Sequence, residues 1–216
     1  MKSKNSLLPI QKFTNTVYDA NTQEVKTLKY WAGYPRQYRF DASRGIFNIK
    51  GMTPITKPGG ALKMIPIAYR IFKDKILGYP LKQWVEFYFI NQELQVCAVL
   101  FHGYSVQNLM RIVDEMFYDD VTLCQVMLTI RPKEKISKSA GGKGNKYYIA
   151  EFEYESLTTE EGLLLETITE SLELWREETL TGDAETLSCA NYSPPTAIVQ
   201  IPVTAEEATD TNTAEA

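Results

Sequence analysis

The sequence has few residues of the kinds that build metal sites, disulfide frameworks or hydrolytic centres. Its three cysteines, Cys97, Cys124 and Cys189, lie far apart and form no CxxC pair, which predicts neither a disulfide framework nor a zinc site. The single histidine, His102, has no Ser or Cys nucleophile motif and no second ligand nearby in the sequence. We therefore expect a protein without enzymatic activity and without a cofactor.

Long apolar runs and nucleotide motifs are also lacking. No stretch approaches the roughly 18 consecutive apolar residues that a membrane-spanning helix needs. The start, MKSKNSLLPIQKF, has no hydrophobic core followed by a small-residue cleavage site, so we expect a cytoplasmic protein without a membrane partner. SAGGKGNK contains no GxxxxGK[ST] pattern, which argues against a P-loop nucleotide triphosphatase.

Basic residues are nearly absent from the C-terminal part of the chain. Residues 151–216 contain 1 Lys+Arg and 16 Asp+Glu, a net charge of −15. Residues 1–150 contain 22 and 11, a net charge of +11, and the two parts sum to −4. A basic body with an acidic C-terminal part is typical of proteins that bind nucleic acid. The alternative is a solvated surface of uneven charge.

The basic charge is densest in RPKEKISKSAGGKGNKYYIAEFEY, residues 131–154. Between Arg131 and Lys146, six basic residues stand against Glu134, giving a charge of +5. Glycines would let backbone amides approach phosphate, and Tyr147 and Tyr148 offer rings for stacking. A solvated hairpin loop is the alternative. The candidate binding residues here are Arg131, Lys133, Lys135, Lys138, Lys143, Lys146 and Tyr148.

Two further stretches place aromatic residues at candidate binding positions. KYWAGYPRQYRFDASRG, residues 29–45, could clamp bases between rings and guanidinium groups. In WVEFYFIN, residues 84–91, Trp84 and Tyr88 share one side of a strand and could form a stacking ladder. The alternatives are an aromatic cluster that packs an N-terminal arm, favoured for Trp31 and Phe40, and a strand face covered by other elements. The candidates in residues 29–45 are Trp31, Tyr34, Arg36, Tyr38 and Arg39.

The hydrophobic periodicity predicts strands with one helix among them. A long strand over residues 62–73 contains Pro66, which indicates an edge or a bulge. A helix over residues 105–117 is expected to begin with Ser105 as its N-cap, with Leu109, Ile112, Val113 and Met116 on one stripe. The expected strands are 45–51, 62–73, 84–91, 94–101, 121–132 and 146–155.

The ends of the chain look different from this middle part. Residues 1–43 are expected to form a loosely structured N-terminal arm with at most one strand. Residues 157–181 predict an acidic amphipathic helix with a capping box of Thr158 and Glu161. Residues 182–216 predict a disordered acidic tail, because they cannot bury enough apolar surface. The expected apolar stripe of the helix is Leu164, Ile168, Leu172 and Trp175.

Alternating acidic residues are candidate metal ligands. Glu151, Glu153 and Glu155 share one face of the strand 146–155, and Asp119 and Asp120 precede the strand 121–132. Such carboxylates could hold a metal for phosphodiester cleavage. The solvated face of a strand is the more common reason for this pattern.

The order of strands, with a helix between the third and fourth, resembles the OB fold over residues 44–156. Together with the acidic C-terminus, it resembles the single-stranded DNA-binding proteins of bacteriophages and mobile elements. The resemblance implies a mainly β, OB-like small barrel whose lysine–glycine loop grips the oligonucleotide. It implies a protein that coats and protects single-stranded DNA, with little sequence specificity, during replication or recombination. Replication or recombination proteins would bind the acidic tail; RNA binding and a homo-oligomer stay open.

The alternative function is a non-enzymatic interaction or assembly protein that docks a partner through its acidic C-terminal helix. Nucleic-acid binding predicts that the lysines of residues 133–146 share a groove with exposed Trp84 or Tyr88. Assembly predicts an exposed apolar patch elsewhere. If the acidic tail competes with DNA for the basic groove, deleting residues 183–216 should tighten DNA binding at low salt.

Overall fold

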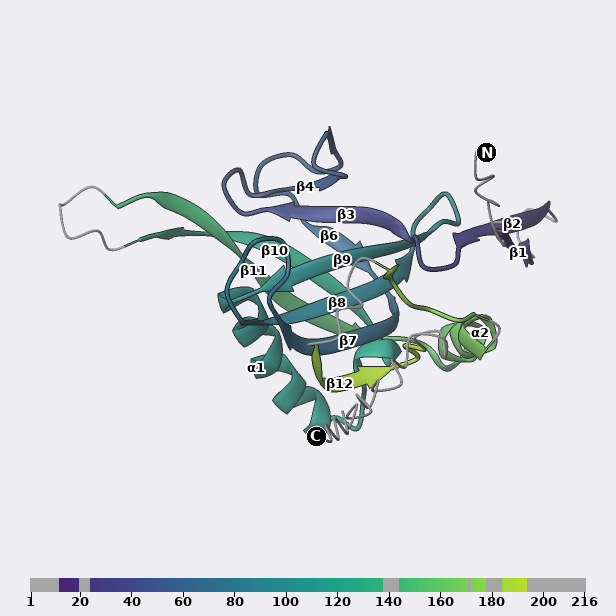
Figure 1. The fold of residues 1–216 in the computed structure, drawn as a ribbon. Coiled ribbons are helices and arrows are strands. Elements are labelled where there is room, and N and C mark those ends of the chain that lie inside the picture. Colours follow the sequence, from purple (N-terminus) through teal and green to yellow (C-terminus); the bar gives the residue numbers. More distant parts are fainter. Residues whose placement is uncertain (1–11, 20–23, 138–143, 171, 178–183, 194–216) are drawn as a thin grey trace, which may run out of the picture.

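About half of the residues that the structure describes form β-strands, and two α-helices lie among these strands (Figure 1). The computed structural model describes residues 12–19, 24–137, 144–170, 172–177 and 184–193. Neither of the helices described has the length and apolar character needed to cross a membrane. The expectation of a mainly β protein is confirmed.

The larger sheet has seven strands in the order β12-β7-β8-β9-β3-β4-β5. Neighbours are antiparallel except β3 and β9, which are parallel and pair Tyr38 with Val99. The strands are β3 Arg36–Asp41, β4 Ile46–Ile49, β5 Thr53–Pro54, β7 Pro66–Asp74, β8 Lys82–Ile90, β9 Val96–His102 and β12 Glu185–Ala190.

A smaller sheet has the order β11-β10-β6, with β6 at Leu62–Met64, β10 at Val126–Ile136 and β11 at Lys146–Ser156. Only Ile65 separates β6 from β7, and the register of β7 against β8 shifts between Pro66 and Ala68. Proline has no N–H to donate to a strand ladder, so it interrupts the pairing at this point. Of the edge or bulge predicted at Pro66, the register shift fits the bulge, and one bent strand passes here from one sheet to the other.

Helix α1, Tyr104–Tyr118, packs on β11 and buries Leu109 and Met116, as its stripe predicts. Its N-cap is Gly103, with a φ of 62°, and the prediction of Ser105 as the cap is wrong. Ser105 is buried, and its Oγ accepts a hydrogen bond of 2.9 Å from the backbone N–H of Ala150. This side chain therefore ties α1 to β11, because it lies inside the first turn and points at the strand.

The C-terminal helix α2, Thr159–Glu170, is shorter than predicted. Its capping box is confirmed: the Thr158 N–H donates to the Glu161 carboxylate at 2.9 Å, and the Glu161 N–H donates to Thr158 Oγ1 at 3.3 Å. Residues 172–177 lie beyond the helix and form isolated bridges with Gly33 and Tyr192. Trp175 packs on Gly33 instead of joining a helical stripe, and the side chain of Leu164 lies outside the described part.

The boundaries predicted for both ends need correction. β1, Lys12–Asp19, and β2, Glu24–Trp31, form an antiparallel hairpin, and β3 belongs to the larger sheet. β3 pairs with the edge of β9. Leu28 and Tyr30 of β2 are buried. β12 pairs with β7 although a disordered tail was expected there, because the edge of β7 offers backbone groups that pairing satisfies. Residues 194–216 lie outside the described part.

Two large apolar clusters cover the two faces of β8. One contains Val85, Phe87 and Phe89 and lies under α1, β10 and β11. The other contains Tyr88 and includes Leu28 from β2 as well as Ile168, Leu172 and Leu174 from the C-terminal part. The predicted alternation of β8 is confirmed, and both of its faces are buried.

Candidate nucleic-acid interface

The β10–β11 hairpin carries the predicted cations. Its strands pair over eleven positions, from Val126 with Ser156 to Ile136 with Lys146, and its end extends beyond the two sheets (Figure 1). The structure leaves the cations on both strands exposed: Arg131, Lys133, Lys135 and Lys146. Lys138 and Lys143, which were also predicted to bind, lie outside the described residues.

Three of these cations face carboxylates on the opposite strand. Arg131 lies 3.5 Å from Glu153, Lys146 lies 2.6 Å from Glu134, and Lys133 pairs with Glu151. The side chains in these pairs are between 43% and 66% exposed, and pairs this exposed contribute about 0–1 kcal/mol each. A phosphate could therefore replace such a carboxylate at little cost.

Lys146 is held at the loop end of the paired strands by two neighbours. Hydrogen bonding to Glu134, and then to Tyr148, raises the pKa of Lys146 above its usual value. Its ammonium group lies 5.6 Å from the centre of the Tyr148 ring. The cation and the half-buried ring are thus adjacent, as an interface for a phosphate and a base requires.

Tyr148 also joins the hairpin to the turn between β3 and β4. Its N–H donates to the Ala42 carbonyl at 2.7 Å. Gly45 has a φ of 63°, and a Cβ there would lie 2.7 Å from the Tyr148 ring. Glycine is needed at this position both for its backbone conformation and for the close approach of the ring.

The same turn brings further cations to the hairpin. Asp41 organises it by accepting hydrogen bonds from the N–H groups of Ser43 and Arg44, at 2.9 and 3.2 Å. Burial acts to raise the pKa of Asp41, but these bonds lower it overall. The Gly59 N–H donates to the Gly45 carbonyl at 2.9 Å, which brings the β5–β6 loop alongside. Arg44 and Lys57, both exposed, are thereby added to the candidate site.

Lys57 was not among the predicted binding residues. Its stretch, TPITKPGG, indicated only a loop, and nothing in the spacing pointed to the hairpin. Arg44 was noticed in the aromatic run of residues 29–45, but not as a partner of the hairpin. Both residues depend on a contact between segments about a hundred positions apart, so a local sequence signal could not have found them.

Trp84 and Tyr88 are not available for stacking, so their predicted exposed ladder is wrong. They are 1% and 0% exposed. Tyr88 lies in the cluster formed by the arm and the C-terminal part, and the Trp84 indole N–H donates to the Asp74 carbonyl at 3.1 Å. Covering an aromatic side chain of this size stabilises the fold by on the order of 2–3 kcal/mol.

The predicted residues of the stretch 29–45 are divided between surface and core. Trp31 and Tyr34 are 44% and 46% exposed, with ring centres 4.9 Å apart. Tyr38 is buried and packs edge-on against Phe89 at 5.1 Å, so its predicted stacking role is wrong. Arg36 forms an ion pair of 3.0 Å with Glu93 and a hydrogen bond with Gln95, and Arg39 is exposed.

Trp31 and Tyr34 do not share a surface with the hairpin. The connection from β2 to β3 lies at one end of the larger sheet, and the β10–β11 hairpin extends from the other end (Figure 1). Two of the three predicted groups of binding residues are therefore separated, and the third is buried.

The acids considered for a metal site have other neighbours. Glu151 and Glu153 pair with hairpin cations, and Asp119 accepts a hydrogen bond of 2.6 Å from the Tyr154 hydroxyl. Within the described residues, no group of three or more His, Cys, Asp or Glu side chains is arranged to hold a metal.

No family model, curated protein or solved structure matches this chain.

Proposed function

We propose that the protein binds single-stranded nucleic acid through its hairpin end. The binding surface, here called the hairpin surface, consists of Arg44, Lys57, Arg131, Lys133, Lys135 and Lys146. The observation that carries the proposal is that a long hairpin extends past both sheets with exposed cations on both strands. The β3–β4 turn, which is hydrogen-bonded to Tyr148, and the β5–β6 loop next to this turn add two more cations.

The charge of this surface supports a polyanionic ligand. Its six cations face three carboxylates, Glu134, Glu151 and Glu153, which leaves a net charge of +3. Binding a phosphate backbone would release counterions and replace the weak exposed pairs. Affinity is therefore expected to fall steeply as the salt concentration rises.

The strand order supports an OB-like arrangement for the ligand site. The elements follow the chain order of the OB fold: β7, β8, β9, α1, β10 and β11. The bent β6–β7 strand joins the two sheets. In this interpretation the barrel is open between β9 and β11, because β9 pairs with β3. The hairpin would then be the loop between strands four and five, one of the two that grip oligonucleotides.

We extend the proposal to a role in coating single-stranded DNA during replication or recombination. Phosphate contacts carry no sequence information, so the protein would bind with little sequence preference. Single strands are favoured over duplex because Tyr147 and Tyr148 could stack on unpaired bases. Single-stranded RNA is the alternative ligand, because the same cations and rings could bind it.

The acidic C-terminal tail is proposed to compete with DNA for the hairpin surface. β12 pairs with β7, so a deletion that starts at residue 183 would also damage the larger sheet. The appropriate deletion is residues 194–216. Tighter DNA binding at low salt after this deletion would support competition, and unchanged affinity would count against it.

A second candidate function is assembly with a protein partner. Phe117 and Tyr118, at the end of α1, are 75% and 84% exposed, and their ring centres lie 5.5 Å apart. Two adjacent exposed rings favour contact with another protein. This surface lies on α1, so it could act beside nucleic-acid binding.

The first experiment is fluorescence anisotropy of a labelled oligo-dT of about 30 nucleotides, titrated at several salt concentrations with a duplex of equal length as a control. Lys135 has no ion pair among the described residues and is the best single test. Lys135→Glu should weaken binding and reduce the salt slope by about 0.7 or more. Arg111→Glu, the same charge change on an exposed α1 position, is the matched control.

Two results would contradict the proposal. If neither oligonucleotide binds at low salt, the hairpin surface has another role. If Arg111→Glu weakens binding as much as Lys135→Glu, net charge and not the hairpin surface determines the affinity.

A further inference from the structure

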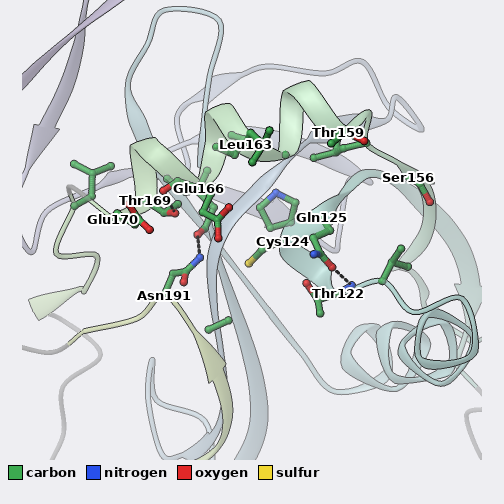
Figure 2. Close-up of a pocket in the computed structure, with 18 of the residues that line it drawn as sticks. Thr122, Cys124, Gln125, Ser156, Thr159, Leu163, Glu166, Thr169, Glu170 and Asn191 are labelled. Atoms are coloured by element: carbon green, nitrogen blue, oxygen red, sulfur yellow. Dashed lines mark hydrogen bonds between the residues drawn. The ribbon is translucent and has the colours of Figure 1, made fainter.

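A cavity of about 1010 Å³ lies beside α2 and the 3₁₀ turn η1, Leu123–Gln125. Figure 2 shows α2 along one side, with Leu163 and Glu166, and Cys124 and Gln125 across from it. Apolar side chains from three parts of the chain line the cavity, among them Ile67, Leu157 and Leu165. Leu163 is 60% exposed although it lies in this apolar setting.

The charges around the cavity have one sign. Its lining includes four carboxylates, those of Asp120, Glu166, Glu170 and Glu173, and no Lys, Arg or His among the described lining residues. A wall that combines leucines with unopposed carboxylates favours an occupant that is both apolar and cationic. An acidic segment would be repelled.

The N-terminal end of the described chain lies near this cavity. Lys12 pairs with Trp31 across the β1–β2 hairpin. The hydroxyl of the neighbouring Tyr30 donates to the carbonyl of Glu173, a lining residue, at 3.2 Å. Eleven residues can span up to about 36 Å when extended, so residues 1–11 have ample length to reach the cavity.

We propose that residues 2–10 of this chain, KSKNSLLPI, dock in this cavity. Leu7, Leu8 and Ile10 would contact the leucines of α2, and Lys2 and Lys4 would lie near the carboxylates of Glu166 and Glu170. This segment carries two cations and no acid. Docking would bury Leu163 and hold α2 against η1.

Charge selects this segment over the other end of the chain. Residues 194–216 follow Ser193, which also lines the cavity. They contain four acids and no basic residue, so they offer no cation to the carboxylates of the wall. A partner protein with a basic, leucine-containing segment could displace residues 2–10, which makes the cavity a docking site for that chemistry. The inference does not depend on nucleic-acid binding.

Cys124 lines the cavity and provides a reporter. Cys97 is buried in the core, and replacing the exposed Cys189 by Cys189→Ser leaves Cys124 as the thiol to follow. Burial raises the pKa of Cys124 to about 12, so maleimide labelling will be slow and relative rates are compared. Deleting residues 2–10 should raise the labelling rate about tenfold, because a tethered segment acts at a high effective concentration.

Point variants give the same test without shortening the chain. Lys2→Glu with Lys4→Glu should accelerate labelling, as should Glu166→Gln with Glu170→Gln. Asp114→Asn with Glu115→Gln, on exposed positions of α1 outside the cavity lining, is the control and should change nothing. Adding the peptide KSKNSLLPI to the deletion variant should restore protection, and the peptide with both lysines replaced by glutamate should not.

Three outcomes would overturn the proposal. Equal labelling rates for the full chain and the deletion variant would mean that residues 2–10 do not occupy the cavity. Acceleration only after deleting residues 194–216 would assign the cavity to the C-terminal segment. Protection that increases with protein concentration would assign it to a second copy of the chain.

Discussion

The ion pairs of the β10–β11 hairpin and the charged cluster under residues 172–177 contain the same residue types in opposite surroundings. In the hairpin, the side chains of Arg131 and Glu153 are 54% and 66% exposed. In the cluster, Glu86 is fully buried, 2.9 Å from Arg176 and 3.8 Å from Arg70. Exposed pairs are weak and exchangeable, whereas a buried pair depends on each partner being present.

The buried cluster fixes how the C-terminal part sits on the sheet. Arg70 lies on β7 and Glu86 on β8, while Arg176 comes from the segment after α2. The Arg70 guanidinium also lies over the rings of Phe72 and Tyr192, at 4.0 and 4.6 Å. Charge in this protein is therefore fixed in one arrangement where it is buried and stays exchangeable where it is exposed.

The largest effect is expected from removing the buried carboxylate. Glu86→Gln removes the buried carboxylate that lies within 4 Å of the Arg176 and Arg70 guanidinium groups and should lower the free energy of unfolding by about 3–5 kcal/mol. Urea denaturation measures this change. Glu153→Gln, the same chemical change in the hairpin, should cost less than about 1 kcal/mol. Similar losses for the two variants would remove the distinction between the regions.

The next largest effect concerns the contact between the hairpin and the β3–β4 turn. Gly45→Ala should destabilise the protein by about 2–4 kcal/mol, because it combines a positive φ with a collision against Tyr148. Gly78→Ala is the matched control: its φ is 74°, but nothing lies within 4 Å of the added Cβ. It should cost about 1–2 kcal/mol. Equal thermal denaturation midpoints for the two variants would mean that the packing of the Tyr148 ring does not require glycine at position 45.

A smaller effect is expected for the exposed pair itself. A double-mutant cycle with Arg131→Ala and Glu153→Ala should give a coupling free energy below about 1 kcal/mol. The coupling should decrease in about 0.5 M salt, because the pair is screened. A coupling that is larger than this, or insensitive to salt, would show that the hairpin pairs are structural and not exchangeable.

The smallest effect on stability is expected from His102, a half-buried group that lies between the buried cluster and the exposed hairpin pairs in exposure. His102 packs against Tyr79 and Trp84, with ring centres 4.9 and 4.8 Å away, and burial lowers its pKa below the usual 6.5. The unfolded chain then binds this proton more readily, so stability is lost as the pH falls below about 6.5. His102→Gln should flatten the pH dependence of urea midpoints in this range, and parallel profiles for the two proteins would contradict the assignment.

Much of the local structure could be predicted because it depends on neighbours in the sequence. The alternation of Val85, Phe87 and Phe89 gives the buried face of β8, and Thr158 with Glu161 gives the start of α2. The interruption at Pro66 follows from its missing N–H. The cations of the hairpin were also predicted from composition, because the loop and its flanking strands are continuous in the sequence.

The errors have one common source. Trp84, Tyr88 and Tyr38 were candidates for stacking because their own strands gave no sign of what lies above them. Trp175 was placed on a helix because its apolar spacing fitted one, but it packs against Gly33.

The sequence by itself determined most strands between residues 45 and 156, the two helices and the basic hairpin of this protein. Only the tertiary structure decided which faces are covered, that β12 joins β7, and that Arg44 and Lys57 lie beside the hairpin. The physical reason is the distance along the chain: the hydrogen bond from Tyr30 to Glu173 joins residues 143 positions apart. Hydrophobic period and secondary-structure propensity predict the apolar face of a segment. Whether that face is buried depends on which distant segment packs against it.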